Sequence, residues 1–259
     1  MASSYTAHNT AHSHTADLPP EEKLRSRAVA YFKDLQNRIC QRFEALDGHA
    51  AFAHTPWEKG AEEQLNGGGE MRVMRGEVFE KVGVNFSQVY GDFSEKFAAE
   101  IPGTTADDRS FWAAGISLVA HMKNPKVPAV HMNLRHIVTA EKAWFGGGAD
   151  LTPSHPYGTD TQLFHTKLEH ACSTYGDTAY TRFKDWCDEY FFLPHREETR
   201  GVGGIFFDYL EDEPEQTFAF VQEVGEAFLE AFTEIVKRRK EEPFTEDDRE
   251  SQLIKRGRY

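Results

Sequence analysis

The sequence predicts an α+β protein in which long amphipathic helices accompany an antiparallel sheet. Two stretches, residues 111–121 and 131–138, alternate between apolar and other side chains with the period of two that strands show. The linker between them contains Pro125 and Pro128, which end strands, so an antiparallel hairpin is the simplest connection. Segments before and after this hairpin carry apolar residues at helical spacing. Strands and helices are therefore expected in separate segments of the chain.

The flanking segments supply the helices and the remaining strands. Residues 1–18 are small and polar, which predicts a disordered tail, and residues 19–259 are expected to form a single domain. A first helix is expected from Pro19 to Leu46, and a last long helix from Pro214 onward. Between residues 47 and 69 the periodicity lapses, and residues 66–69 predict a flexible loop. The other expected elements are strands at 71–78, 82–90 and 205–208 and helices at 161–175 and 177–191.

The composition limits the partners and the compartment. The formal charge of −13 argues against binding to nucleic acid or to an anionic membrane surface, so an anionic ligand needs a local group of arginines. Cys40, Cys172 and Cys187 show no metal-ligand spacing, which predicts reduced, buried thiols in the cytoplasm. No run approaches the ~18 apolar residues of a membrane span.

One face of the predicted hairpin is polar and forms the candidate site. Ser117, Val119 and His121 share a face of the first strand, and His131, Asn133 and Arg135 share a face of the second. A symmetric hairpin sets His121 opposite His131 and Ser117 opposite Arg135, with Cβ atoms about 5 Å apart. Such a patch can hold an anion and move protons.

The segments after the hairpin add further candidates. Gly146–Gly148 allow the backbone to approach a ligand, and Asp150 can accept hydrogen bonds from an acidic N–H group. The loop at 192–200 supplies His195, Arg196 and Arg200, and the strand after it ends in Asp208. A plain turn and a solvated charged loop are the alternatives for these two segments.

The histidines leave a metal site as an alternative. His121, His131, His165 and His195 lie in segments that can converge, although none shows the HExxH or CxxC spacing typical of zinc sites. A structural role for each also stays open. The hairpin makes His121 and His131 the expected functional pair.

Four blocks of sequence carry a family resemblance. HMNLRHIV, WFGGGADLTP, RFKDWCDEYFFLPHR and RGVGGIFFDYL resemble signature blocks of oxygen-dependent coproporphyrinogen III oxidases, in order, within a match from about Arg72 to the closing KRGRY. The resemblance implies oxidative decarboxylation of two propionates of coproporphyrinogen III to vinyls, giving protoporphyrinogen IX in heme biosynthesis. Molecular oxygen is then the oxidant, carbon dioxide and hydrogen peroxide are products, and neither flavin nor heme takes part. The implied fold is a large flat antiparallel sheet between layers of helices, assembled as a homodimer.

The resemblance also assigns roles to residues. It matches Ser117 and residues 133–135 to substrate contacts, His131 to a proton donor, and the four histidines to a proposed divalent-metal set. Asp150 and Asp208 are added as acceptors for pyrrole N–H groups. The expected substrate contacts are Ser117, Asn133, Leu134, Arg135, Asp150 and Arg196, the catalytic residues His131 and Asp208, and the metal ligands His121, His131, His165 and His195.

Relatives in this family continue beyond the RGRY block, whereas this sequence stops at Tyr259. We therefore expect lower activity and weaker dimerisation than in an extended chain. Two other functions stay open at this point. One is a metal-dependent oxygenase that uses the histidines, and the other is a tetrapyrrole carrier without catalysis.

Overall fold

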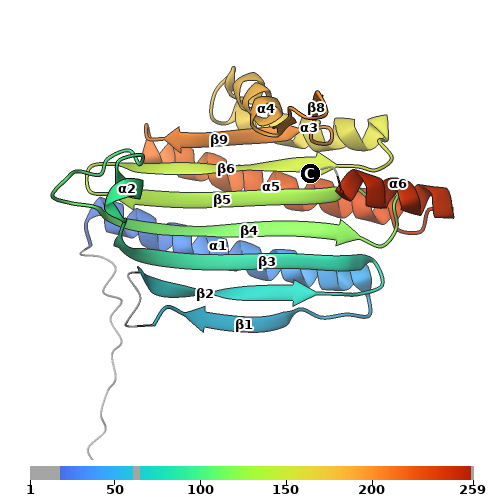
Figure 1. Cartoon of the computed structure of the whole chain (residues 1–259), viewed down its shortest axis with the longest axis horizontal. Helices are drawn as coiled ribbons and strands as arrows, with labels where there is room; N and C mark the ends of the chain where they lie inside the picture. The colour runs from blue at the N-terminus through green and yellow to red at the C-terminus, as the bar shows by residue number, and fades with distance from the viewer. Residues whose placement is uncertain (1–17, 61–64, 258–259) are drawn as a thin grey trace, which may run out of the picture.

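The computed structural model describes residues 18–60 and 65–257 and confirms the α+β class. Its centre is a seven-stranded antiparallel sheet in the order β1-β2-β3-β4-β5-β6-β9 (Figure 1). The strands are β1 (Ala53–Glu58), β2 (Leu65–Met74), β3 (Phe79–Asp92), β4 (Ser110–Met122), β5 (Ala129–Thr139), β6 (Ala143–Thr152) and β9 (Gly204–Leu210). The predicted tail falls outside the described residues except at Leu18.

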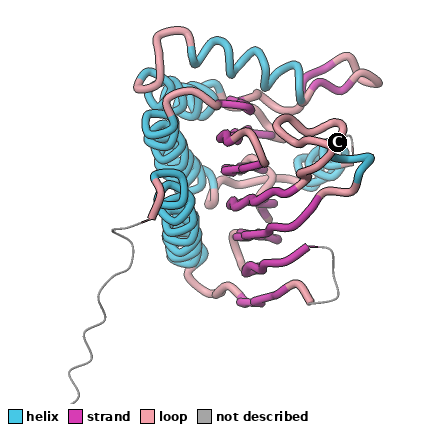
Figure 2. Tube along the Cα trace, turned by 90° about the vertical axis from the view of Figure 1, so that its left-hand side faces the viewer, coloured by secondary structure: helices cyan, strands magenta, loops and turns pink. Residues whose placement is uncertain are grey.

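Most helices lie on one face of the sheet. Figure 2 shows them as a layer beside the strands. This layer contains α1 (Pro20–Asp47), α3 (Gly158–Ser173) and α5 (Pro214–Arg239), while α4 (Ala179–Tyr190) packs on β9 at the edge. In the described part of the chain, the other face carries α6 (Glu246–Arg256) at one end. The short helix α2 (Glu95–Ala98) and the two-stranded hairpin of β7 (Phe192–Leu193) and β8 (Glu198–Thr199) complete the elements.

The predicted alternation in β4 and β5 is confirmed. Side chains at even positions point to the helices, and Ile116, Leu118, Met132 and Leu134 are completely buried there. Side chains at odd positions of both strands lie on the opposite face, and all except Thr139 at the end of β5 keep partial exposure. This second face is open over much of the sheet, so the polar side chains predicted for the site lie on it.

The hairpin forms, but its predicted register is wrong by two residues. Val119 lies opposite His131, Ser117 opposite Asn133, and Gly115 opposite Arg135. The turn decides this, because Asn124 closes it by accepting a hydrogen bond from the Lys126 amide at 2.9 Å. A shift by an even number leaves every side chain on its predicted face.

Glycine-rich segments expected as loops are strands. Residues 66–69 lie within β2, and β1 occupies part of the segment where the periodicity lapses. Gly146–Gly148 lie within β6. Glycine has no side chain to show the period of two, so these strands could not be recognised from the sequence. The predicted helices at both ends are confirmed as α1 and α5, whereas α6 was not predicted.

No helix of the described residues is both long and apolar enough to cross a membrane. The three cysteines are buried and unbonded to one another, as expected.

A buried carboxylate ties the end of α1 to the sheet. Asp47 is 4% exposed and accepts four backbone hydrogen bonds. The donors are the amides of Ala50, Glu77, Val78 and Phe79, at 2.9–3.2 Å. Burial alone raises the pKa of Asp47, but these donors together hold it below its usual value. The ionised form therefore fixes the turn that begins β3.

We expect Asp47→Ala to lower the free energy of unfolding by about 3 kcal/mol, because four backbone amides, one buried and three partly buried, lose their acceptor. Denaturant unfolding measures this change. Asp107→Ala removes an exposed carboxylate and is the control, for which a change within about 0.5 kcal/mol is expected. Equal effects of the two substitutions would contradict the structural role of Asp47.

The charge of Asp47 also predicts a dependence on pH. Because its pKa is lower in the folded chain, its contribution is complete above the unfolded pKa and is lost as the pH falls through the folded pKa. Asp47→Asn removes this term. Between about pH 6 and pH 3, the wild type is therefore expected to lose more stability than Asp47→Asn. Parallel pH profiles would rule out this linkage.

Candidate functional site

A cavity of about 300 Å³ lies on the open face, over β5 and β6 at the side where β9 joins the sheet. Polar and charged side chains line one part of it and aromatic rings another. Its lining residues are His131, Asn133, Arg135, Gly147, Gly148, Tyr190, Phe191, Arg200 and Phe206. The polar row predicted from the sequence therefore borders a cavity.

Asp150 organises the polar part of this cavity from beneath. Its side chain is 1% exposed, and Oδ1 lies 2.9 Å from Nδ1 of His131 on the neighbouring strand. Arg200 donates two hydrogen bonds to the same carboxylate, from Nη2 to Oδ1 at 2.8 Å and from Nε to Oδ2 at 3.1 Å. Such paired contacts to a buried carboxylate are strong and directional. A carboxylate accepts, so Nδ1 of His131 carries a proton and Nε2 is left for a bound molecule.

Glycine in the chain after β8 brings Arg200 to Asp150. Gly201 has φ +63°, and a Cβ there would meet the carbonyl oxygen of Leu151 at 2.2 Å. Without a side chain, the segment bonds to β6 through the Val202 amide and the Leu151 carbonyl at 3.0 Å. The guanidinium of Arg200 also lies over the Phe191 ring, 3.7 Å from its centroid.

A second ion pair lies on the same side of the cavity. Arg135 on β5 donates from Nη2 to Oδ2 of Asp208 on β9, and from Nη1 to Oδ1 of Asn133 at 3.2 Å. Gly146 lies between the two partners on β6, and a Cβ there would be 2.2 Å from Oδ1 of Asp208. The glycine run is thus required for close approach, although the groups that approach are protein side chains.

Aromatic rings form the other wall. Tyr190 stacks on Phe206 with centroids 4.2 Å apart, although its own side chain is 60% exposed. Phe191 meets Phe206 edge to face at 6.2 Å and His131 at 6.0 Å. This wall offers ring faces and edges to an apolar part of a ligand.

The structure brings together some predicted site residues and separates others. Ser117 neighbours Asn133 in the sheet, on the open face. Leu134 is fully buried on the helix side, so its side chain cannot line the cavity. Arg196 is exposed on the β7–β8 hairpin, 3.8 Å from Glu198, and Arg200 is the arginine that reaches the cavity.

The predicted pyrrole acceptors already have partners. Asp150 accepts from His131 and Arg200. Asp208 accepts from Arg135 and from the Tyr209 amide at 3.0 Å. The geometry favours Asp150 as a residue that positions His131 and Arg200, and Asp208 as one that positions Arg135. Direct contact of either aspartate with a pyrrole stays a prediction.

The four histidines proposed as metal ligands do not assemble in one chain. Among the described residues, no group of three or more histidine, cysteine or acidic side chains can hold a metal ion. His165 uses both ring nitrogens, to the Tyr180 hydroxyl at 2.8 Å and the Val202 carbonyl at 2.9 Å. His195 is exposed on the β7–β8 hairpin. His121 lies opposite Lys81, and burial together with Arg256 lowers its pKa. These residues therefore do not fit the expected metal.

Sequence reasoning named Arg200 as a candidate but selected Arg196 as the substrate contact, and it missed the aromatic wall. The two arginines of the loop look alike in the sequence, and only the glycine after Arg200 distinguishes it. Nothing in the sequence marks Tyr190, Phe191 and Phe206 as lining a site, because apolar runs most often form cores. Tyr190 is exposed and Phe191 partly exposed where α4 packs on the edge strand β9, whereas Phe206 is buried beneath Tyr190.

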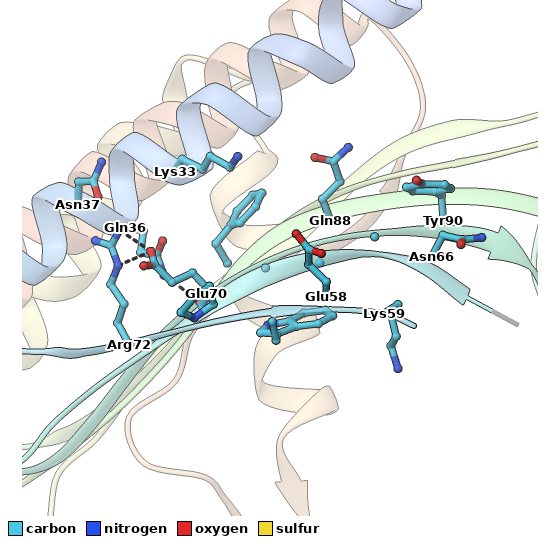
Figure 3. A pocket seen from close by; sticks show the side chains of 16 residues that line it. Lys33, Gln36, Asn37, Glu58, Lys59, Asn66, Glu70, Arg72, Gln88 and Tyr90 are labelled. Carbon is cyan, nitrogen blue, oxygen red and sulfur yellow. Dashed lines mark hydrogen bonds and ion pairs between the residues drawn. The ribbon is translucent and has the colours of Figure 1, made fainter. Parts of the chain in front are cut away.

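A larger hollow of about 710 Å³ lies elsewhere, between α1 and strands β1 to β3. Figure 3 shows Lys33 and Asn37 of α1 above it, with Glu58 and Gln88 pointing up from the strands. Glu70 there is paired with Arg72, Nη2 to Oε2 at 2.6 Å. None of its lining residues, all in the described part of the chain, is a histidine or cysteine. The smaller cavity is therefore the candidate active site.

We expect Gly146→Ala to break the Arg135–Asp208 pair and to lower the free energy of unfolding by about 1–3 kcal/mol through overpacking. Gly176→Ala has open space around its Cβ and is the control. Denaturant unfolding is measured for both, and again with Gly146→Ala in an Asp208→Ala background. When Asp208 is already alanine, Gly146→Ala should lower the free energy of unfolding much less than it does in the wild type, because the carboxylate that its Cβ would meet is gone. An undiminished loss would show that another contact is at fault.

Known proteins agree with the sequence resemblance. The profile of the family described as coproporphyrinogen III oxidase matches residues 27–259. An oxygen-dependent coproporphyrinogen-III oxidase of Rickettsia bellii (strain OSU 85-389) is 48% identical over 248 residues, which are 92% of this chain and 87% of the relative. The enzyme of the same name from Rickettsia akari (strain Hartford) is 48% identical over 249 residues, with the same two coverages. The chain belongs to the coproporphyrinogen III oxidase family.

Proposed function

We propose that this chain catalyses the oxygen-dependent oxidative decarboxylation of two propionates of coproporphyrinogen III to vinyls, giving protoporphyrinogen IX in heme biosynthesis. Membership of the family supports the reaction. The observation that carries the assignment to this cavity is that His131, held by the buried Asp150, lies four residues before Arg135 on the same face of one strand. These supply a proton-transfer group and a cation for a propionate.

The reaction needs a proton donor. For each propionate, a C–C bond breaks to release carbon dioxide, a hydrogen leaves the neighbouring carbon with two electrons, and molecular oxygen takes up both electrons. Hydrogen peroxide then forms from oxygen, that hydrogen and one further proton. Histidine exchanges protons near neutral pH, and His131 is the histidine of this cavity. We assign it the delivery of that proton from Nε2, with Asp150 holding the ring in place.

Arg135 is assigned the propionate. It keeps a planar guanidinium at the cavity, with Asn133 beside it and Ser117 beyond in the same face. The cavity volume, about 300 Å³, is at the lower end of the range for small-molecule sites. We therefore propose that the cavity holds one pyrrole ring with its propionate. The rest of the tetrapyrrole then lies on the open face of the sheet.

The proposal gives no step to a metal, because the four histidines do not assemble. It includes molecular oxygen as co-substrate, without flavin or heme, as the resemblance implies. It also includes a homodimer in the cytoplasm. Buried free thiols at all three cysteines support a reducing compartment, and sedimentation of the purified chain measures the oligomer.

Turnover with and without oxygen tests the function. The purified chain is incubated with coproporphyrinogen III in air and under anaerobic conditions, and protoporphyrinogen IX and carbon dioxide are measured. Product is expected only in air, with one oxygen consumed for each carbon dioxide released. Tight binding without oxygen uptake would identify a tetrapyrrole carrier instead, and loss of turnover on chelation would identify a metal-dependent oxygenase.

We expect His131→Ala to reduce turnover by about 100-fold or more while binding of coproporphyrinogen III changes much less, since general acids typically contribute this much. Steady-state oxygen uptake and substrate titration measure the two effects. His170→Ala removes an exposed histidine of α3 and is the control. Wild-type turnover in folded His131→Ala would refute the assigned role.

A further inference from the structure

A second cavity, of about 350 Å³, lies on the helix side of the sheet and shares no lining residue with the candidate active site. It is formed where α1 and α5 begin, beside the adjoining ends of β5, β6 and β9, and Figure 1 shows both helices starting at this end of the sheet. Leu24, His136, Trp144 and Phe145 line its interior side, and three glutamates lie at its rim.

His136 is the polar group in the interior of this cavity. It is 1% exposed, and its Nδ1 lies 3.1 Å from the Trp144 carbonyl oxygen. A carbonyl only accepts, so Nδ1 carries the proton and Nε2 of the neutral ring is an acceptor. Among the described residues, Nε2 has no hydrogen-bond partner. Burial lowers the pKa of His136 to about 4, so the ring is neutral at pH 7.

The imidazole is held rigidly in this orientation. It stacks on Phe145 with centroids 4.2 Å apart and meets Trp112 edge to face at 5.6 Å. The cavity thus contains a fixed acceptor that is buried and unpaired. Buried polar groups in proteins nearly always have a partner, so this one needs an explanation.

The rest of the cavity is apolar or neutralised. Leu24 and Phe145 are buried residues of its wall. Each glutamate at its rim has a cationic partner: Glu21 pairs with Arg25, Glu215 with Arg27 at 2.7 Å, and Glu211 with Lys142 at 2.8 Å. Because each of these rim carboxylates is already paired, none of them is left to pair with a charged ligand. A neutral ligand meets apolar walls, the acceptor of His136, and Trp144, whose buried indole Nε1 donor also has no partner among the described residues.

We propose that this cavity is a binding site for a small neutral molecule with an apolar body of one ring and a hydroxyl that donates a hydrogen bond to Nε2 of His136. The size is sufficient, because an apolar cavity of about 150 Å³ holds one benzene. The hydroxyl pairs the acceptor that the protein leaves unpaired, and the ring covers the apolar wall. Phenol is the simplest probe of this class.

Phenol is compared with anisole, which has the same ring but no donor. Titration of the full chain is followed by the ¹⁵N chemical shifts of the histidine side chains. Phenol is expected to bind about 3- to 10-fold more tightly than anisole, as one net hydrogen bond allows, and to move the Nε2 resonance of His136. His136→Phe keeps an aromatic ring against Phe145, and the preference for phenol should disappear there. His170→Phe is the control and should retain it.

A second variant keeps the acceptor and removes the space. Leu24→Trp enlarges a wall residue and should abolish binding of both probes while His136 remains. The proposal is overturned if the Nε2 resonance of wild-type His136 does not respond to phenol, or if His136→Phe keeps the preference. It is also overturned if neither probe binds the wild type, in which case the acceptor is simply hydrated. None of these outcomes depends on oxygen-dependent turnover.

Discussion

The division of the central sheet into a covered and an open face is the constraint on which the rest of the molecule depends. Even positions of β4 and β5 are mostly apolar because α1 and α5 pack on this face, with His136 as a buried exception. Odd positions are then free to carry polar groups. The same alternation that builds the core thus gathers Ser117, His131, Asn133 and Arg135 on one surface, and a change of one residue in register would bury them.

Asp150 makes a polar surface into an organised site. It is almost wholly buried, yet it lies on the open side, because Arg200 and the chain after β8 cover it. A buried carboxylate is costly unless it is paired and hydrogen-bonded. Here the pairing joins β5, β6 and the chain after β8, so the contacts that offset the cost of burial also fix the orientation of His131.

The sequence predicted the long elements and the polar face, because periods of two and 3.6 are visible wherever side chains are large. It failed where the side chains are glycine, as in Gly67–Gly69 of β2, whose pairing is set by neighbouring strands. It also favoured Arg196 over Arg200. The β7–β8 hairpin determines which of the two arginines reaches Asp150, and that pairing is not visible in the sequence. The partners of His136 and His165 depend on contacts between distant segments, which no local pattern records.

Charge balance links the two ion pairs to the chemistry. Arg135 pairs with Asp208, and Arg200 pairs with Asp150, so the cavity is close to neutral before a substrate enters. In the proposed reaction, a propionate brings one negative charge into this partly buried space, where charges interact more strongly than in water. His131, to which we assign delivery of the proton, lines the same cavity. In the proposed reaction, release of carbon dioxide and use of one proton to complete hydrogen peroxide remove the charge that the propionate brought, so the cavity returns to its starting charge.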